Sequence, residues 1–398
     1  MKSLKKYLDK IKPQFEPGGK LHAFHSVFDG FETFLFTPNE TSKSGVHIHD
    51  SRDSKRTMII VVLALMPCLL MGMYNAGYQN WLAAGQTQFP FWQLMGYGFF
   101  SILPAIVVTY VVGLGIEFIV AQWRGEEIQE GFLVTGILIP MICPIETPLW
   151  MLAVATAFSV IFAKEVFGGT GFNIVNIALI TRAFLFFAYP ASMSGDMVFI
   201  GRDSILGLGY TLPDTFTGAT PLGQIATATG ATEIVDINGE VTTLWDMFLG
   251  LIPGSFGETS TLCILIGALI LLATGIADWR IIVSVFVGGV VMSLIANLTA
   301  TSTYPASFLS VGEQLCLGGF AFAAVFMATD PVTAARTTVG KYIYGFLVGV
   351  IAILIRNYNS GYPEGAMLAV LLMNVFAPLI DYCVVQANIN RRLKRIKA

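Results

Sequence analysis

The chain has 398 residues, of which 55% are hydrophobic and only 12% are charged. Soluble globular domains carry about 25% charged residues, and the mean hydropathy here is +0.69, so the composition excludes an ordinary soluble protein. The formal net charge of -3 gives no reason to expect nucleic acid as a partner.

Basic residues are concentrated at the two ends of the chain. Residues 1–56 hold ten of the 23 lysines and arginines, and residues 386–398 hold five more and no acidic residue. Basic residues beside membrane spans are retained on the cytoplasmic side. We therefore expect a cytoplasmic N-terminal segment (1–56), a basic cytoplasmic tail (386–398) and an even number of spans between them.

Ten apolar segments lie between these ends. A helix needs roughly 20 apolar residues to cross the ~30 Å hydrocarbon core of a bilayer. The segment 131–145 is short and contains Pro140 and Pro144, which predicts a broken helix, and residues 244–257 are typical of a re-entrant or interfacial piece. The sequence thus predicts an all-α integral membrane protein with about ten transmembrane helices. The expected spans are 57–75, 97–121, 131–145, 149–166 and 172–189 in a first half (57–189), and 258–276, 280–300, 308–328, 340–356 and 364–385 in a second half (258–385).

The segment between the halves, 190–257, is expected outside the cytoplasm. Residues 190–242 hold six acidic residues against the single Arg202. This asymmetry is what retention of basic residues inside would produce, and it supports the count of spans. The basic residues that alternating spans place in cytoplasmic loops are Arg124, Lys164, Arg280, Arg336 and Lys341.

Two parts of the chain resemble each other. Residues 130–144 align without gaps with residues 364–378, since each stretch begins with Glu-Gly and ends with proline. Further upstream, Gly115 and Gly349 fall at matching positions of the same alignment. In the expected topology the first copy runs outward and the second inward. Inverted repeats with a binding site at their interface are typical of transporters. The sequence therefore predicts two inverted repeats with broken or re-entrant helices.

A short motif rich in threonine and glycine lies in the expected external loop. It runs from Asp214 to Thr220 and reads Asp-Thr-Phe-Thr-Gly-Ala-Thr. Such residues also favour ordinary turns, so a turn without chemistry is the alternative. The Thr220 hydroxyl can attack a phosphoryl group and leave a stable phosphoester. Gly218 and Ala219 would let the backbone approach a bulky donor, while Asp214 would hold the donor's metal or orient the loop.

The motif resembles the flavinylation site of the Nqr and Rnf respiratory complexes. In those families the last threonine of a D-x-x-[ST]-G-A-T pattern is joined to the phosphate of FMN. The resemblance implies covalent FMN on Thr220, within a cofactor site made of Asp214, Thr217, Gly218 and Ala219. Position 217 is threonine where serine is common in the family, which keeps the hydroxyl. A flavin transferase that acts outside the cytoplasm is also implied.

The resemblance extends over nearly the whole chain. A basic N-terminal extension with the sequence FEPGGK favours the NqrB family, the B subunits of Na+-translocating NADH:quinone oxidoreductases, over the D subunits of ferredoxin-linked Rnf complexes. The former would place the chain in the bacterial inner membrane, among lipids and the A, C, D, E and F subunits as partners. The family-like stretches are 15–20, 71–77, 164–173, 182–191, 252–258, 326–332 and 362–369.

Residues 167–176 (FGGTGFNIVN) form a second candidate site. Small residues let helices pack closely in lipid, and this is a purely structural explanation. Alternatively, Asn173 and Asn176 lie one helical turn apart and would both hydrogen-bond to the edge of a flavin. The resemblance implies a non-covalent riboflavin in the membrane sector but does not say which residues bind it.

Four acidic residues in or beside the expected spans form a candidate Na+ pathway. A charge at the centre of a bilayer costs roughly 2.5–3.5 kcal/mol, so such residues are usually functional, and Na+ as a hard cation prefers oxygen ligands. Asp381 lies in the last span, Glu130 and Glu364 begin the repeat-like spans, and Asp330 follows the eighth span. Helix capping and the helix dipole are the structural alternatives for the last three.

Arg182 would pair with an acid, reach the membrane interface, or neutralise a flavin phosphate or semiquinone.

The first hypothesis for function is an electron-carrying membrane subunit. By resemblance, electrons from NADH pass through FMN on Thr220 and through riboflavin to ubiquinone while Na+ is exported. Coupling requires that the affinity or access of Na+ differ between flavin redox states. The rival is a flavin-free channel or secondary transporter, which fits ten spans and an inverted repeat but has no need of the Asp214–Thr220 motif. A third hypothesis keeps the flavin and assigns the chain to an Rnf complex.

Overall fold

The computed structural model describes residues 2–15, 19, 28, 44–46, 54–125, 131–193, 198–213, 216, 218–359 and 361–397. These residues form helices and loops, and no extended strand occurs among them. The all-α membrane fold predicted from the sequence is therefore confirmed. Three residues of the expected sites, Glu130, Asp214 and Thr217, lie outside the described residues.

Six helices in the described part of the chain are long and apolar enough to cross a bilayer. Three of them contain a proline, at Pro67, Pro104 and Pro378, which membrane helices tolerate because neighbouring groups satisfy the freed carbonyls. The six are α3 (Ser54–Ala83), α4 (Phe91–Arg124), α6 (Leu149–Ser159) with the π-helical turn η3 (Val160–Lys164) and the 3-10 turn η4 (Glu165–Phe167), α12 (Trp279–Leu298), α15 (Thr338–Tyr358) and α16 (Ala366–Lys397).

Three apolar helices are too short to cross a bilayer alone. They are α5 (Phe132–Ile142), α7 (Ile177–Ala188) and α11 (Thr261–Ala273). At 1.5 Å per residue such helices cover only about 20 Å. The helix expected to break at Pro140 or Pro144 is instead the short, continuous α5, which passes through Pro140 and ends before Pro144. Helix α7 begins five residues later than expected, because the Asn176 side chain accepts hydrogen bonds from Ala178 N and Leu179 N and caps the helix there.

The expected span 308–328 is not one helix. It consists of α13 (Val311–Cys316), α14 (Phe320–Phe322) and the π-helical turn η6 (Ala323–Met327). The break falls at Gly318 and Gly319, whose φ angles of +62° and +68° are adopted without strain by glycine. Arg356 of α15 donates to the carbonyl oxygens of Gln314 and Leu317, which the break leaves without helical partners. The continuous span was wrong because glycines and a distant arginine together permit the break.

In its described residues, the segment between the two halves carries short helices only. They are α8 (Pro190–Met193), α9 (Pro221–Thr227) and α10 (Leu244–Leu249), and α10 begins with a capping box between Thr243 and Asp246. The expected re-entrant piece 244–257 is one such short helix followed by a loop. The remaining helical elements are α1 (Lys2–Ile11), η1 (Lys12–Gln14) and η5 (Pro305–Phe308).

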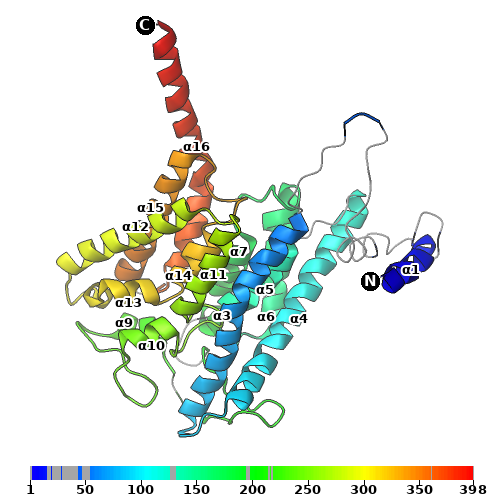
Figure 1. The fold of residues 1–398 in the computed structure, drawn as a ribbon. Helices are drawn as coiled ribbons and strands as arrows, with labels where there is room; N and C mark the ends of the chain where they lie inside the picture. The colour runs from blue at the N-terminus through cyan, green and yellow to red at the C-terminus, as the bar shows by residue number, and fades with distance from the viewer. Residues whose placement is uncertain are drawn as a thin grey trace.

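The first and last membrane helices fix which end of the bundle is which. The start of α3 and the end of α16 lie at the same end, and the last turns of α16 extend past the other helices, whereas α9 and α10 lie toward the opposite end (Figure 1). We call these the tail side and the loop side. An even number of crossings, as predicted, is consistent with this arrangement.

The two similar stretches begin at opposite sides of the bundle. Gly131 lines a cavity together with Thr57 near the start of α3, whereas Glu364 lines a second cavity together with Thr220. Their helices nevertheless differ, since α5 has 11 residues and α16 has 32. The upstream glycines differ too. A Cβ on Gly349 would lie 2.1 Å from Val285 O of α12, and Gly115 faces open space.

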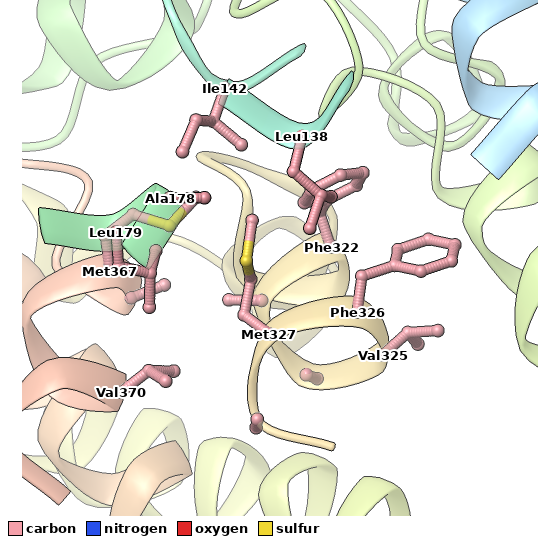
Figure 2. Close-up of a cluster of buried hydrophobic side chains, with 14 of the residues drawn as sticks. Leu138, Ile142, Ala178, Leu179, Phe322, Val325, Phe326, Met327, Met367 and Val370 are labelled. Carbon is pink, nitrogen blue, oxygen red and sulfur yellow. The ribbon is translucent and has the colours of Figure 1, made fainter. Parts of the chain in front are cut away.

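The core of the bundle surrounds the broken helix. Side chains of α14 and η6 pack between those of α5, α7 and α16 (Figure 2). In lipid, helices associate through close packing rather than through the hydrophobic effect. The π-helical turn η6 is buried along its whole length, so the element that interrupts the regular bundle is also enclosed by protein. The cluster labelled in the figure comprises Leu138, Ile142, Ala178, Leu179, Phe322, Val325, Phe326, Met327, Met367 and Val370.

Candidate functional site

Two cavities at opposite sides of the bundle hold most of the expected site residues that the structure describes. The loop-side cavity has a volume of about 90 Å³ and is lined by α7, the start of α9, residues 252–259, the break at 316–319 and residues 362–364. The tail-side cavity has a volume of about 130 Å³ and is lined by the starts of α3 and α5, the loop before α7 and the loop after η6. Each has room for several water molecules.

Thr220 lies at the edge of the loop-side cavity and caps α9. Its Oγ1 accepts a hydrogen bond from Gly223 N at 3.1 Å and donates none within the described residues. The backbone before it is tightly placed, because a Cβ on Gly218 would lie 2.3 Å from Ile200 Cδ1. Thr220 is half-buried. A hydroxyl that is held in place and keeps its proton available suits a covalently attached group, and Gly218 and Ala219 of the predicted motif lie directly beside it.

A buried ion pair lines the same cavity. Arg182 of α7 is 1% exposed, and its Nη2 donates to both carboxylate oxygens of Glu364 at 2.9 and 3.0 Å. Of the roles that remained open for Arg182, pairing with an acid is the one that the structure shows. Such charge-assisted bonds compensate the cost of removing both groups from water. The pair joins α7 to the start of α16.

Glu258 is a third charged side chain in the loop-side cavity, and sequence reasoning did not select it. It is 6% exposed, and its Oε1 has no hydrogen-bond partner within the described residues. The other oxygen faces the break in the eighth span, since a Cβ on Gly319 would lie 2.8 Å from Glu258 Oε2. The only signal for Glu258 in the sequence was an acidic residue at the start of an apolar run. Its neighbours in the cavity, Arg182 and Glu364, are far away along the chain, so the sequence did not indicate that they would lie close to it.

The two predicted asparagines and Asp330 meet in the tail-side cavity. Asn173 and Asn176 belong to the loop before α7 rather than to a helix. Asn176 Nδ2 donates to Asp330 Oδ2 at 3.3 Å. Asp330 also accepts from Val332 N and Thr333 Oγ1, at 3.1 and 3.0 Å, so it organises the turn after η6 as the capping alternative predicted. Its carboxylate is therefore both a turn-forming group and part of a cavity wall.

Lys164 and Glu117 are buried charges that the sequence analysis missed. Lys164 was expected in a cytoplasmic loop, but it ends the π-helical turn η3, lines the tail-side cavity and is 2% exposed. Its Nζ forms an ion pair with Glu117 of α4, and the Phe132 ring lies 6.0 Å away. The available signal was Glu117 itself, a single acid within the apolar run of the second span. A charge in such a run needs a partner nearby.

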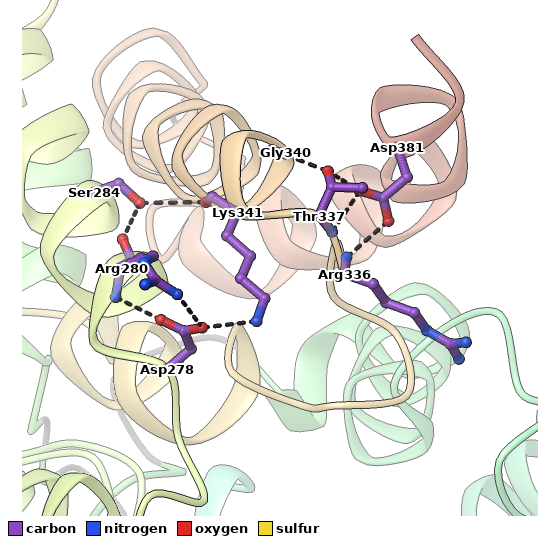
Figure 3. A network of polar contacts seen from close by, with 8 residues as sticks. All are labelled: Asp278, Arg280, Ser284, Arg336, Thr337, Gly340, Lys341 and Asp381. Carbon is purple, nitrogen blue, oxygen red and sulfur yellow. Dashed lines mark hydrogen bonds and ion pairs between the residues drawn. The ribbon is translucent and has the colours of Figure 1, made fainter. Parts of the chain in front are cut away.

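Asp381 lies apart from both cavities, in a polar network near the tail side (Figure 3). It accepts hydrogen bonds from Arg336 N at 2.7 Å, Thr337 N at 3.0 Å and Thr337 Oγ1 at 2.5 Å, and so it holds the start of α15. Next to it, Lys341 Nζ lies 2.7 Å from Asp278 Oδ2. Partial burial disfavours the charged form of Asp278, but the hydrogen bonds from Lys341 and from the backbone of Arg280, together with the charges of these two residues, outweigh it and lower the pKa of Asp278.

The three expected acids that the structure describes are thus not gathered at one site. Glu364 lines the loop-side cavity, Asp330 lines the tail-side cavity, and Asp381 belongs to the network at the start of α15. Leu138 and Phe326 of the apolar cluster in Figure 2 also line the tail-side cavity. These two cavities thus each hold buried charged side chains in a mainly apolar lining.

Comparison with known proteins gives a consistent result over nearly the full chain. A family model described as the NQR2, RnfD, RnfE family matches residues 41–390. The chain is 43% identical to the B subunit of the Na(+)-translocating NADH-quinone reductase of Chromohalobacter salexigens, covering 98% of this chain and 95% of the relative. It is 44% identical to the protein of the same name from Ectopseudomonas mendocina and 42% identical to that from Klebsiella pneumoniae, in each case over 98% of this chain and 99% of the relative.

Proposed function

Because this chain belongs to the NQR2, RnfD, RnfE family, we propose that it is the B subunit of a Na+-translocating NADH:quinone oxidoreductase and that it carries FMN on Thr220. The observation that carries the proposal is the similarity to relatives of that name over 98% of the chain, including the N-terminal extension. In this role the chain lies in the bacterial inner membrane with both termini in the cytoplasm. Its partners are the A, C, D, E and F subunits of the same complex.

Attachment of FMN uses the Thr220 hydroxyl. The Oγ1 atom forms a bond to the phosphorus of a flavin nucleotide, the hydroxyl proton leaves, and the donor's leaving group departs with its bonding electrons. A separate flavin transferase supplies the donor. The proposal is supported by the position of Thr220 at the start of α9, half-buried and facing the loop-side cavity, with no acceptor for its proton in the described part of the chain. Asp214 and Thr217 complete the proposed site.

Electron transfer through the membrane requires further flavin chemistry. Bound flavins supply one-electron steps, and the protein supplies position and electrostatics. We place riboflavin near the tail-side cavity, where the Asn173 and Asn176 side chains lie, as hydrogen-bond partners for a flavin edge. Ubiquinone is the proposed final acceptor on the same side.

Na+ moves between the two cavities in this proposal. Asp330 and Glu364 lie at opposite ends of the path and Asp381 lies at the tail side, whereas Glu130, the fourth acid of the proposed pathway, lies outside the described residues. In this proposal an ion passes the apolar cluster of Figure 2 only when the surrounding helices move. Redox state must change the affinity or the access of Na+ for transport to be coupled. The π-helical turns η3 and η6 each contribute one residue to the wall of the tail-side cavity, Lys164 and Phe326, and such turns are frequent at functional sites.

Two other functions are alternatives. A flavin-free channel or secondary transporter is favoured by the two cavities at opposite sides of the bundle, which need no cofactor. The D subunit of an Rnf complex is favoured by the shared family model. Dependence on quinone rather than ferredoxin, together with the N-terminal extension, separates the Nqr proposal from the Rnf alternative.

The test of the flavin proposal is in-gel fluorescence of the denatured chain after co-expression with its flavin transferase. We expect a fluorescent band for the wild type and for Thr220→Ser, and none for Thr220→Ala, because serine keeps the hydroxyl. Thr227→Ala is a matched control, since Thr227 lies at the far end of the same helix and should leave the band unchanged. A dark wild-type band, with the transferase active on another substrate, would return the transporter to first place.

A further inference from the structure

The buried charges around the loop-side cavity are not all paired. Arg182 is engaged by both oxygens of Glu364. The nearby Arg356 donates to Gln314 O, Leu317 O and Glu364 O, so its charge is set against the carbonyl end of α13. Glu258 is left without a cationic partner of its own within the described residues, although it is 6% exposed.

Unused oxygen atoms surround this carboxylate. Glu258 Oε1 makes no hydrogen bond in the described part of the chain, and the Ser255 hydroxyl beside it makes none of good geometry. Ser255 is 3% exposed, and both residues line the cavity. The absence of a Cβ on Gly319 keeps the carboxylate close to the break in the eighth span. Buried polar groups without partners usually mark a missing water or ion.

We propose that Glu258 and Ser255 form a binding site for one monovalent hard cation in the loop-side cavity. The carboxylate supplies the single negative charge, while the Ser255 hydroxyl, backbone carbonyls and water supply further oxygen ligands. The choice of Na+ as occupant rests on the proposed function. In that case the site holds the ion on the loop side of the bundle, beside the Arg182–Glu364 pair.

The chemistry of the site favours a monovalent cation over other occupants. An anion would face two carboxylates, Glu258 and Glu364, and a divalent ion would find only one uncompensated charge. The other titratable side chains that line the cavity, Tyr362 and Cys316, are neutral in their ordinary state and do not change this balance. A proton on Glu258 is the remaining way to neutralise the site, and it is the alternative that the experiment must separate.

The experiment is labelling of the purified complex by dicyclohexylcarbodiimide, which reacts with protonated carboxyl groups in apolar surroundings. The complex is incubated without NADH, in choline chloride or in sodium chloride, and the peptide that carries Glu258 is examined by mass spectrometry. We expect labelling in choline and protection by Na+. In Ser255→Ala, which keeps the carboxylate, the Na+ concentration for half-protection should rise about fivefold because one neutral oxygen ligand is lost.

Controls make the outcome decisive. Glu258→Gln should abolish the label, and Glu240, an exposed acid of the same loop segment, should show no effect of Na+. Equal labelling of Glu258 in choline and sodium would mean that a proton neutralises it, and no labelling in either would mean that the charge needs no counterion. Both results would overturn the proposal. Thr220→Ala should keep the protection, so loss of the flavin function would be distinguishable from loss of the cation site.

Discussion

Two buried ion pairs lie beside opposite cavities, and their surroundings differ. Lys164 and Glu117 on the tail side are enclosed, with side chains 2% and 5% exposed. Arg182 and Glu364 on the loop side have a second carboxylate, Glu258, and the Thr220 hydroxyl in the same cavity. A closed pair mainly holds two helices together, whereas a pair beside an unpartnered acid can respond to a ligand. Burial alone therefore does not separate a structural charge from a functional one.

The largest expected effect is the loss of Arg182. In Arg182→Met, Glu364 and Glu258 both remain in the cavity without their nearest cation, and breaking such a buried pair costs about 3–5 kcal/mol. We expect a strongly lowered thermal midpoint of the purified complex, or failure to assemble. Arg182→Lys should be milder, because one ammonium group can still contact Glu364. A midpoint equal to the wild type in Arg182→Met would contradict the view that this pair matters for the fold.

A double substitution tests whether the tail-side pair is the closed one. Lys164→Met alone should lose about 3–5 kcal/mol, but Lys164→Met combined with Glu117→Leu should recover most of it, because an apolar pair of similar size replaces a neutralised one. The corresponding change on the loop side, Arg182→Met with Glu364→Leu, should recover less, since Glu258 stays unpaired. Thermal unfolding of the four variants measures this difference. Equal recovery on both sides would remove the distinction.

The smallest expected effect lies outside the membrane, at Asp278. Its folded-state pKa is lowered, so its contribution to stability is complete above the ordinary pKa of about 3.9 and is lost as pH falls through the lower, folded value. Asp278→Asn should therefore reduce the thermal midpoint slightly and evenly between pH 5 and 8, by roughly the effect of a surface pair. Below the ordinary pKa the gap between the variant and the wild type should close. A gap that widened in acid would reverse the sign of this argument.

Much of the fold was predictable because a membrane-spanning helix requires a long run of apolar residues, which the sequence shows directly. Apolar runs located the long helices, and a short apolar run that ends before Pro144 located α5, although the break expected at Pro140 is absent. The breaks were harder. Nothing in the local pattern of Gly318 and Gly319 shows that Arg356 will satisfy the carbonyls at the break, because that arginine lies some 40 positions away.

The candidate site residues also fall into two groups, those that a local motif reveals and those that only the fold brings together. Thr220, Asn173 and Asn176 were found from local motifs, and the structure places each of them on a cavity wall. The pairings of Arg182 with Glu364 and of Lys164 with Glu117 join residues 182 and 47 positions apart. A single sequence does not show which residues so far apart along the chain are in contact in the folded protein. Glu258 was missed for this reason, and Asp381 was grouped with acids from which the fold separates it.

The π-helical turns bear on how the molecule tolerates changes in chain length. An α-helix turns 100° per residue, and a π-helical turn holds one residue more than an α-helical turn. Removing a single residue from Ala323–Met327 would let that turn close as ordinary α-helix without unfolding the element. Because the π-helical turn already holds that extra residue, the segment beyond it would keep nearly the same direction relative to Phe322, and Asp330 would stay at the tail-side cavity. These two turns are therefore places where the chain tolerates the loss of one residue, whereas a deletion in the regular α-helix beside them would rotate everything beyond it by about 100°.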